Sequence, residues 1–184
     1  MISTAQTTLV PAGTWTVDPV HSTVGFSVKH LGIATVRGHF DEFEGTLEIG
    51  ESDESARAHG TVKAVSVNTN DSGRDEHLRS ADFFGVEANP ELTFASTGIE
   101  HVDDETFLIT GDLTMNGITK PVKLQAEVEG TETDPWGNER VGLEALGELN
   151  RKDYGLTWNQ VLGSGNVLVS DKVKLVIEVS AVKA

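Results

Sequence analysis

Six histidines have the widest chemical range in this chain, since an imidazole can ligate a metal ion or transfer a proton near neutral pH. They are His21, His30, His39, His59, His77 and His101. No pair has the HxxxH or HExxH spacing of a zinc site, His39 and His59 lie among charged residues, and the chain has no cysteine. A metal site would have to be assembled from distant strands, so no metal and no other cofactor is expected.

Acid–base chemistry by carboxylates is the next candidate. Asp82 and Asp153 could act as an acid and a base if both faced one cleft, but the sequence shows no such cleft. Asp82 lies in SADFFG, a setting more typical of a cap or turn residue. The chain has no GxSxG nucleophile elbow, and nothing associates a particular serine with a particular histidine. An enzyme that uses His30, Asp153 or a metal stays open as an alternative.

The segment LNRKDYGLTWN, residues 149–159, contains the most informative charges. If the alternation that precedes it continues, Arg151 and Asp153 point to the apolar side of a strand near its end. The two side chains are then either an ion pair that seals a barrel end or a polar anchor for a ligand head group, with the structural reading favoured. His30 has a comparable position on an earlier strand.

The strand that positions the first two histidines is HSTVGFSVKH, residues 21–30. Val24, Phe26 and Val28 alternate with polar or small residues, which predicts a half-buried strand. The same alternation places His30 on the apolar face and His21 on the opposite face. Nine residues at ~3.3 Å each separate them by ~30 Å, so they cannot share a metal ion, and His21 is expected to be structural.

Similar alternation recurs along the chain and predicts about eight antiparallel strands, enough to close a barrel with room for one ligand. A change of parity at Ala64–Val65 predicts a bulge or bend, and Asn116–Gly117 predicts a hairpin turn. Only residues 71–85 resemble a helix, which Leu78 and Phe83 or Phe84 could hold across one end of the barrel. The inward residues are mostly aliphatic, so a cavity and a filled interior are both open.

Bulk composition limits the partners. With 184 residues we expect one domain, and the net charge of −15 disfavours nucleic acid and attachment to an anionic membrane. No apolar run approaches the ~20 residues that cross a bilayer, so stable membrane insertion is not expected. The first residues lack the pattern of a secretory signal, and a cytoplasmic location is therefore predicted unless a signal was removed.

Several spaced motifs, in order, resemble the YceI-like family of polyisoprenoid-binding proteins. The resemblance covers roughly residues 14–182, leaving residues 1–13 as an expected flexible segment before a domain of residues 14–184. The motifs are WTVDPVHSTVGFSVKHLG (15–32), VRGHFDEFEGTLEI (36–49), RDEHLRSADFF (74–84), NPELTFAST (89–97), GDLTMNGITKPVKL (111–124) and NRKDYGLTWN (150–159).

The resemblance implies an all-β, extended lipocalin-like antiparallel barrel with a long apolar cavity for an isoprenoid chain, and no catalytic residues. The family's motif positions correspond here to His21, His30, Asp75, His77, Leu78, Asp82, Phe83, Arg151, Asp153 and Tyr154. Many relatives carry an N-terminal signal and act in a periplasm, and this sequence departs from them there.

Together these features predict a soluble lipid-binding protein for an isoprenoid quinone, a polyprenyl phosphate or a similar amphiphile, acting in transport, storage or stress protection. The alternatives are an enzyme acting on such a molecule and a filled structural barrel, and a homodimer through an edge or the barrel mouth is left open. The residues expected to contact the lipid are Val24, Phe26, Val28, His30, Phe43, Leu47, Leu92, Phe94, Leu113, Met115, Leu124, Val141, Leu143, Leu149, Arg151, Asp153, Leu175 and Ile177.

Overall fold

The computed structural model describes residues 9–52 and 55–184. All pairings between its named strands are antiparallel. The elements, in chain order, are β1 (Gly13–Val17), the 3₁₀ helix η1 (Pro19–His21), β2 (Thr23–His30), β3 (Ala34–Phe40), β4 (Phe43–Ile49), β5 (Arg57–Lys63), the 3₁₀ helix η3 (Ala64–Ser66), β6 (Val67–Asn68), α1 (Ser72–Arg79), β7 (Glu91–His101), β8 (Thr106–Met115), β9 (Ile118–Thr133), β10 (Glu139–Asn150), the 3₁₀ helix η4 (Arg151–Tyr154) and β11 (Val169–Lys183).

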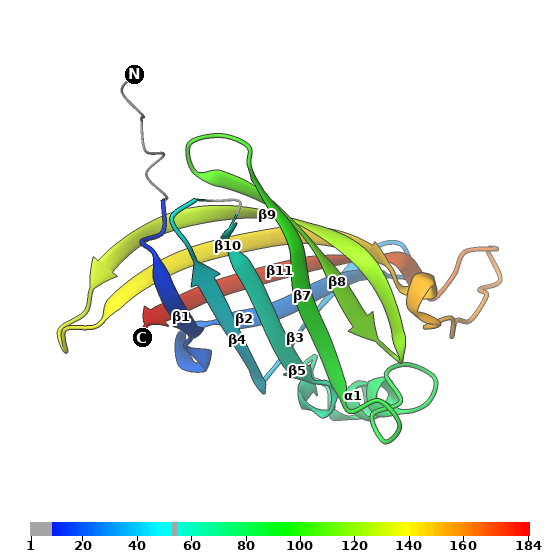
Figure 1. Ribbon diagram of the computed structural model, residues 1–184. Coiled ribbons are helices and arrows are strands. Elements are labelled where there is room, and N and C mark those ends of the chain that lie inside the picture. Colours follow the sequence, from blue (N-terminus) through cyan, green and yellow to red (C-terminus); the bar gives the residue numbers. More distant parts are fainter. Residues whose placement is uncertain (1–8, 53–54) are drawn as a thin grey trace.

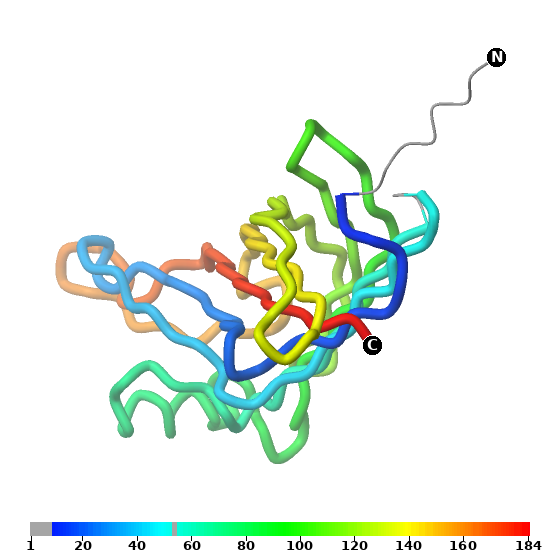
Figure 2. Tube along the Cα trace, turned by 90° about the vertical axis from the view of Figure 1, so that its left-hand side faces the viewer, coloured from blue at the N-terminus to red at the C-terminus, as the bar shows by residue number. Residues whose placement is uncertain are grey.

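The strands form a closed eight-stranded barrel (Figure 1). β1 and β2 run in the same direction along β11, β3 and β4 pair with β2 and β1, and β5 and β6 pair with β4 and β3. β1 and β2 together therefore form one bent barrel strand, and so do β3 with β4 and β5 with β6. With β7 to β11 they make an eight-stranded meander, which closes where β1 pairs with the C-terminal end of β11 (Figure 2). The predicted fold class is therefore confirmed.

The three bends lie next to one another and are held by hydrogen bonds. The amides of Asp41 and Glu42 donate to the carbonyl and the Oγ of Ser66 at 3.1 and 3.0 Å, and Lys63 N donates to Glu42 O at 2.9 Å. In the first bend, Asp18 N donates to Ser180 O at 2.8 Å. The predicted bend at Ala64–Val65 is the 3₁₀ helix η3, in which Val65 is exposed. The bends turn one half of the three strands away from the other half.

α1 lies against β6, where the third bent strand has no partner in β7 (Figure 1). Asp71 caps the helix by accepting a hydrogen bond from Arg74 N at 2.9 Å. Asp75 is buried and accepts hydrogen bonds from the amide and hydroxyl of Thr69 at 2.8 and 2.6 Å. The helix is shorter than the predicted 71–85, because a turn begins at Ser80, whose amide bonds to His77 O at 3.1 Å.

Two hairpin turns connect β8 to β9 and β9 to β10, and the first is where the sequence predicts it. Asn116 and Gly117 both have positive φ, 54° and 73°, as a type I′ turn between β8 and β9 requires. The β9–β10 turn includes Asp134, whose amide donates to Asn138 O at 2.9 Å. β1 and β3 are strands that were not predicted, because the bends put their inward residues out of phase with those of the strands that follow them.

Two clusters of buried side chains lie toward opposite ends of the barrel. We call the first the Trp15 cluster: Val10, Trp15, Phe107, Ala126, Val128, Val141 and Ala181. We call the second the Tyr154 cluster: Phe83, Met115, Tyr154 and Leu156. Val10 belongs to the first, so the fold starts before residue 14, and the rest of the predicted flexible segment, residues 1–8, lies outside the described residues.

Candidate ligand-binding site

An apolar cavity of about 460 Å³ lies inside the barrel. Its volume falls in the range of small-molecule sites, and its length is set by the strands that line it. Along β2 the lining extends from Val24 to His30, six residue steps or about 20 Å. Side chains therefore do not fill the interior completely, which contradicts the alternative of a filled barrel.

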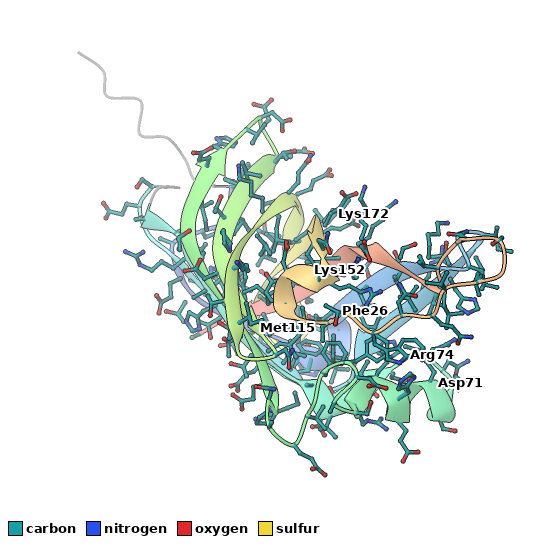
Figure 3. All side chains as sticks on the ribbon, turned by 90° about the vertical axis from the view of Figure 1, so that its right-hand side faces the viewer. Phe26, Asp71, Arg74, Met115, Lys152 and Lys172 are labelled. Carbon is teal, nitrogen blue, oxygen red and sulfur yellow. The ribbon has the colours of Figure 1, made fainter. Side chains whose placement is uncertain are left out.

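Most of the residues predicted from alternation line this cavity. They are Val24, Phe26, Val28, His30, Phe43, Leu47, Leu92, Phe94, Leu113, Met115, Leu124, Leu143, Leu149, Arg151, Leu175 and Ile177. Figure 3 looks toward the end of the barrel where Phe26 and Met115 lie between the strands and α1. The period of two correctly separated inward from outward side chains at all of these positions.

Val141, which the alternation also predicted to contact the ligand, does not line the cavity. Its side chain points inward but is buried at 1% exposure in the Trp15 cluster, where Trp15 has no exposed surface. Trp15 also donates from Nε1 to Pro11 O at 2.9 Å. The indole fills the barrel at the level of Val141, so the cavity ends before it.

Asp153 does not line the cavity either, because β10 ends at Asn150. The Asn150 side chain accepts a hydrogen bond from Lys152 N at 3.0 Å and caps the start of η4. Gly155, in the left-handed conformation (φ 72°), follows its last residue. In a 3₁₀ helix the strand alternation no longer applies, and Asp153 is exposed. The predicted pairing of Arg151 with Asp153 is therefore wrong.

Arg151 lies at the cavity wall with only 3% of its surface exposed. Its guanidinium donates four hydrogen bonds to backbone carbonyls, namely Ser170 O (2.9 Å), Leu156 O (2.6 Å), Trp158 O (2.9 Å) and Val169 O (3.2 Å). These carbonyls belong to the first part of the segment between η4 and β11 and to the first two residues of β11. Arg151 thus holds that segment against the barrel, which is a structural task.

Burial lowers the pKa of Arg151 from its usual value, and the nearby Asp171 carboxylate opposes that shift. The closest contact between the two charges is 3.8 Å, and Asp171 is 43% exposed. Because the guanidinium group of arginine stays protonated far above neutral pH, Arg151 is a buried cation at pH 7. Its charge is compensated mainly by carbonyl oxygens.

Polar side chains gather where the cavity reaches the surface between β2 and α1. We call these side chains, together with the adjacent Leu168, the rim: Lys29, His30, Arg74, His77 and Leu168, all of which line the cavity. Lys29 and Arg74 are also exposed, so the cavity meets solvent here. Arg74, on α1, donates from Nε and Nη2 to the hydroxyl and carbonyl of Thr69 at 2.7 and 2.8 Å (Figure 3).

His77 is positioned by contacts on several sides. Its Nε2 lies 2.9 Å from Asp82 Oδ2, and its ring packs edge-on against Phe83 and Trp158 at centroid distances of 5.1 and 4.7 Å. Asp82 does not line the cavity and takes part in the turn after α1 through its amide, which bonds to Ser80 Oγ at 3.3 Å. The turn interpretation of Asp82 is therefore supported, and an Asp82–Asp153 acid–base pair in the cavity is not.

His21 lies away from the cavity in a charged group at the first bend. The Arg140 network consists of Asp18, His21, Asp134 and Arg140. His21 Nδ1 lies 2.7 Å from Asp18 Oδ2, while Arg140 donates to Asp18 at 2.9 Å and to Asp134 at 2.8 Å. Hydrogen bonds from His21 and Arg140 lower the pKa of Asp18 to about 2, and Arg140 does the same for Asp134. This network joins the β1–β2 bend to the β9–β10 turn.

Sequence reasoning missed several lining residues. Val36 and Phe40 lie on β3, where their alternation with Arg37 and His39 could have identified them. Trp158 and Leu168 lie outside the strands, so no period of two could place them.

Inward glycines make room for two of the phenylalanines. An added Cβ at Gly38 would lie 2.4 Å from Phe26 Cζ, and one at Gly111 would lie 2.3 Å from Phe94 Cζ. Each ring thus covers the backbone of the neighbouring strand and lies flat along the wall, which preserves open space in the middle of the barrel.

The described residues contain no group of three or more His, Cys, Asp or Glu side chains arranged to hold a metal ion. In the same part of the chain, no helix has the length and apolar character that crossing a bilayer would need.

The fold and the cavity define a class: closed, lipocalin-like antiparallel barrels with an internal apolar site open at one end. Comparison with known proteins identifies the family within that class. The family model described as the YceI-like domain matches residues 15–181. The YceI protein of Salmonella arizonae is 42% identical over 164 residues, which are 89% of this chain and 82% of that protein. The chain therefore belongs to the YceI-like family.

Solved structures agree with this assignment. The YceI protein of Campylobacter jejuni has a TM-score of 0.74 and 33% identity, covering 85% of this chain and 90% of that one. A polyisoprenoid binding domain from Saccharophagus degradans, implicated in plant cell wall breakdown, has a TM-score of 0.71 at 14% identity, covering 95% of this chain and all of that one. At that identity the second likeness concerns the fold alone.

Proposed function

We propose that this protein binds the apolar chain of a polyisoprenoid lipid, of the isoprenoid quinone or polyprenyl phosphate type, inside the barrel. The observation that carries the proposal is the shape of the site: a long apolar cavity, blocked by the Trp15 cluster at one end and bordered by polar side chains at the other. A chain-shaped amphiphile matches both features. The family assignment supports it, and the Saccharophagus degradans domain with the same fold is a polyisoprenoid binding domain.

Burial of the chain supplies the free energy of binding. Each CH₂ group removed from water contributes ~0.8 kcal/mol, so a tail that spans the cavity contributes well above the cost of ordering it. Lys29 and Arg74 are cations at the rim, where a phosphate or a quinone oxygen would lie once the tail is buried. We therefore place the head group at the rim and the end of the tail against the Trp15 cluster.

The proposed activity is binding for transport, storage or protection of the lipid, without chemical conversion. His30 lines the cavity, but Asp153, the other side chain considered for catalysis, is exposed and outside the lining. Asp75 is the buried carboxylate of α1 and is occupied by two hydrogen bonds from Thr69. The acid–base pair considered from the sequence, Asp82 with Asp153, therefore receives no support from the geometry.

The test is lipid extraction from protein purified without detergent from its own host, followed by rebinding. Mass spectrometry of the organic extract should show a polyisoprenoid lipid at close to one molecule per protein. Delipidated protein should rebind a fluorescent polyprenyl phosphate or quinone with the same stoichiometry. Absence of lipid from the extract, together with no rebinding, would show that the proposed function is wrong.

A further inference from the structure

Two exposed aliphatic side chains project from adjacent loops at the open end of the barrel. Ile33, in the β2–β3 turn, is 83% exposed, and Val161, in the segment between η4 and β11, is 73% exposed. The loops contact each other: Leu31 N donates to Leu168 O at 2.9 Å, and Asn166 Nδ2 donates to Leu31 O at 3.2 Å. Leu168 and the neighbouring His30 belong to the rim. The two side chains thus lie beside the cavity entrance.

Hydrogen bonds within the longer loop hold Val161 in this outward position. Val161 forms an isolated antiparallel bridge with Val167, and Leu162 N donates to Asn166 O at 2.8 Å. Leu168 N donates to Gln160 O at 2.9 Å. In Figure 1 this loop, in orange, projects from the barrel farther than α1 at the same end. The exposed aliphatic groups are therefore presented on a structured hairpin.

Charge is distributed unevenly in a way that favours this end for a lipid surface. The chain has 29 Asp and Glu residues, yet residues 22–40 and 154–170, about a fifth of its length, contain none. Residues 154–170 carry no charged side chain at all, and residues 22–40 carry only Lys29 and Arg37 besides two histidines. These loops can approach lipid head groups without burying or repelling a carboxylate, although the molecule as a whole is strongly acidic.

We propose that the β2–β3 turn and the 155–168 loop dock on the surface of a lipid bilayer, with Ile33 and Val161 inserted at the level of the head groups. This inference rests on the proposed function, because it gives an apolar ligand a route from the bilayer to the cavity that avoids water. Two separate aliphatic tips give shallow, reversible attachment, as a carrier needs. A stable protein partner would instead be expected to bury a continuous patch with a central aromatic anchor.

The test uses delipidated full-length protein and phosphatidylcholine vesicles. The variant is Ile33→Ser combined with Val161→Ser, and the control is Trp136→Ser, which removes an 82% exposed side chain from the β9–β10 turn at the opposite end of the barrel. Vesicle flotation measures docking, and transfer of a fluorescent polyprenyl chain out of the vesicles measures the route. Circular dichroism melts confirm that all three proteins are folded.

We expect the double variant to lose at least five-fold in the fraction that floats with vesicles and in transfer rate, while Trp136→Ser behaves as the unmodified protein. Equal docking by the double variant would overturn the proposal, and so would an equal loss in the control. A third result would also overturn it. If the unmodified protein does not bind vesicles and light scattering shows that it is a dimer while the double variant is a monomer, the loops bind a second copy of the chain instead.

Ligand binding in the absence of vesicles keeps the two proposals separate. The same fluorescent chain, added from a cyclodextrin complex, should bind the double variant and the unmodified protein with equal affinity. If neither protein binds it, the proposed function fails, whereas the flotation result still supports or contradicts docking. If both proteins bind the fluorescent chain and neither floats with vesicles, the docking proposal is wrong and the proposed function stands.

Discussion

The buried guanidinium group of Arg151 holds the segment between η4 and β11 against the barrel. Its four hydrogen bonds go to the carbonyls of Leu156 and Trp158 and to those of the first two residues of β11, of which Val169 O also accepts from Asn159 Nδ2 at 2.7 Å. Sequence alternation correctly placed this side chain inward, but it could not distinguish a head-group anchor from a structural clamp. That distinction depends on loop carbonyls that have no pattern in the sequence.

Replacing Arg151 with methionine should therefore cost stability first. We expect Arg151→Met to lower the free energy of unfolding by about 3 kcal/mol, since several buried carbonyls lose their partner. Urea unfolding measures the change, and hydrogen exchange should show faster opening in residues 156–170. The control is Lys152→Met, whose side chain is 51% exposed. A loss below about 0.5 kcal/mol in Arg151→Met would contradict the clamp.

The Arg140 network should make stability depend on acid pH. Asp18 has a folded pKa of about 2, below the ordinary value of 3.8, because His21 and Arg140 stabilise its ionised form. A lowered folded pKa gives stabilisation that is complete above pH 3.8 and is lost as the pH falls through about 2. We expect Arg140→Leu to unfold at lower urea concentration than the unmodified protein at pH 7, with a smaller difference at pH 2.5.

Equal differences between the two proteins at both pH values would contradict that role. A suitable control is Lys172→Leu, which removes a surface cation whose nearest carboxylate, on Glu148, is 3.5 Å away and 55% exposed.

At the scale of the elements, the bends decide how much the sequence could show. Alternation identified β2, β4, β5 and β7 to β11 through their inward residues, and the parity change at Ala64–Val65 correctly indicated a bend. β1 and β3 each precede one of the other two bends, so their inward residues are out of phase with the strands that follow them, although the alternation within β3 is intact. The cap at Asn150 and the left-handed Gly155 could have shown that β10 ends before Asp153.

Ser66 should be important for the line of bends. Its Oγ accepts from Glu42 N at 3.0 Å and donates to Lys63 O at 2.7 Å, connecting two neighbouring barrel strands. We expect Ser66→Ala to lower the free energy of unfolding by about 1 kcal/mol in thermal or urea melts. Val65→Ala, in the same turn but 51% exposed, should change it by less than about 0.5 kcal/mol. The reverse order would contradict this role.

For the whole molecule, the barrel has two unlike ends. The Trp15 cluster fills one, while the other carries the polar rim and the acid-free loops. The sequence predicted the barrel and most of its lining, because the side of a strand on which a residue lies follows from a period of two. The depth at which the cavity stops could not be predicted, because it depends on where the Trp15 ring lies across the barrel, as the misplaced Val141 shows.

The central claim is that the cavity holds the apolar chain, and the most direct test is to fill it. Ala145 lines the cavity on β10, and the next residue, Leu146, points outward with 46% exposure. Titration of a fluorescent polyprenyl phosphate into Ala145→Phe and Leu146→Phe compares the same added ring inside and outside the barrel, and Val28→Phe provides a second inward variant.

We predict at least ten-fold weaker binding for the two folded inward variants and unchanged binding for Leu146→Phe. Full affinity in folded Ala145→Phe and Val28→Phe would contradict the claim that the ligand lies in this cavity.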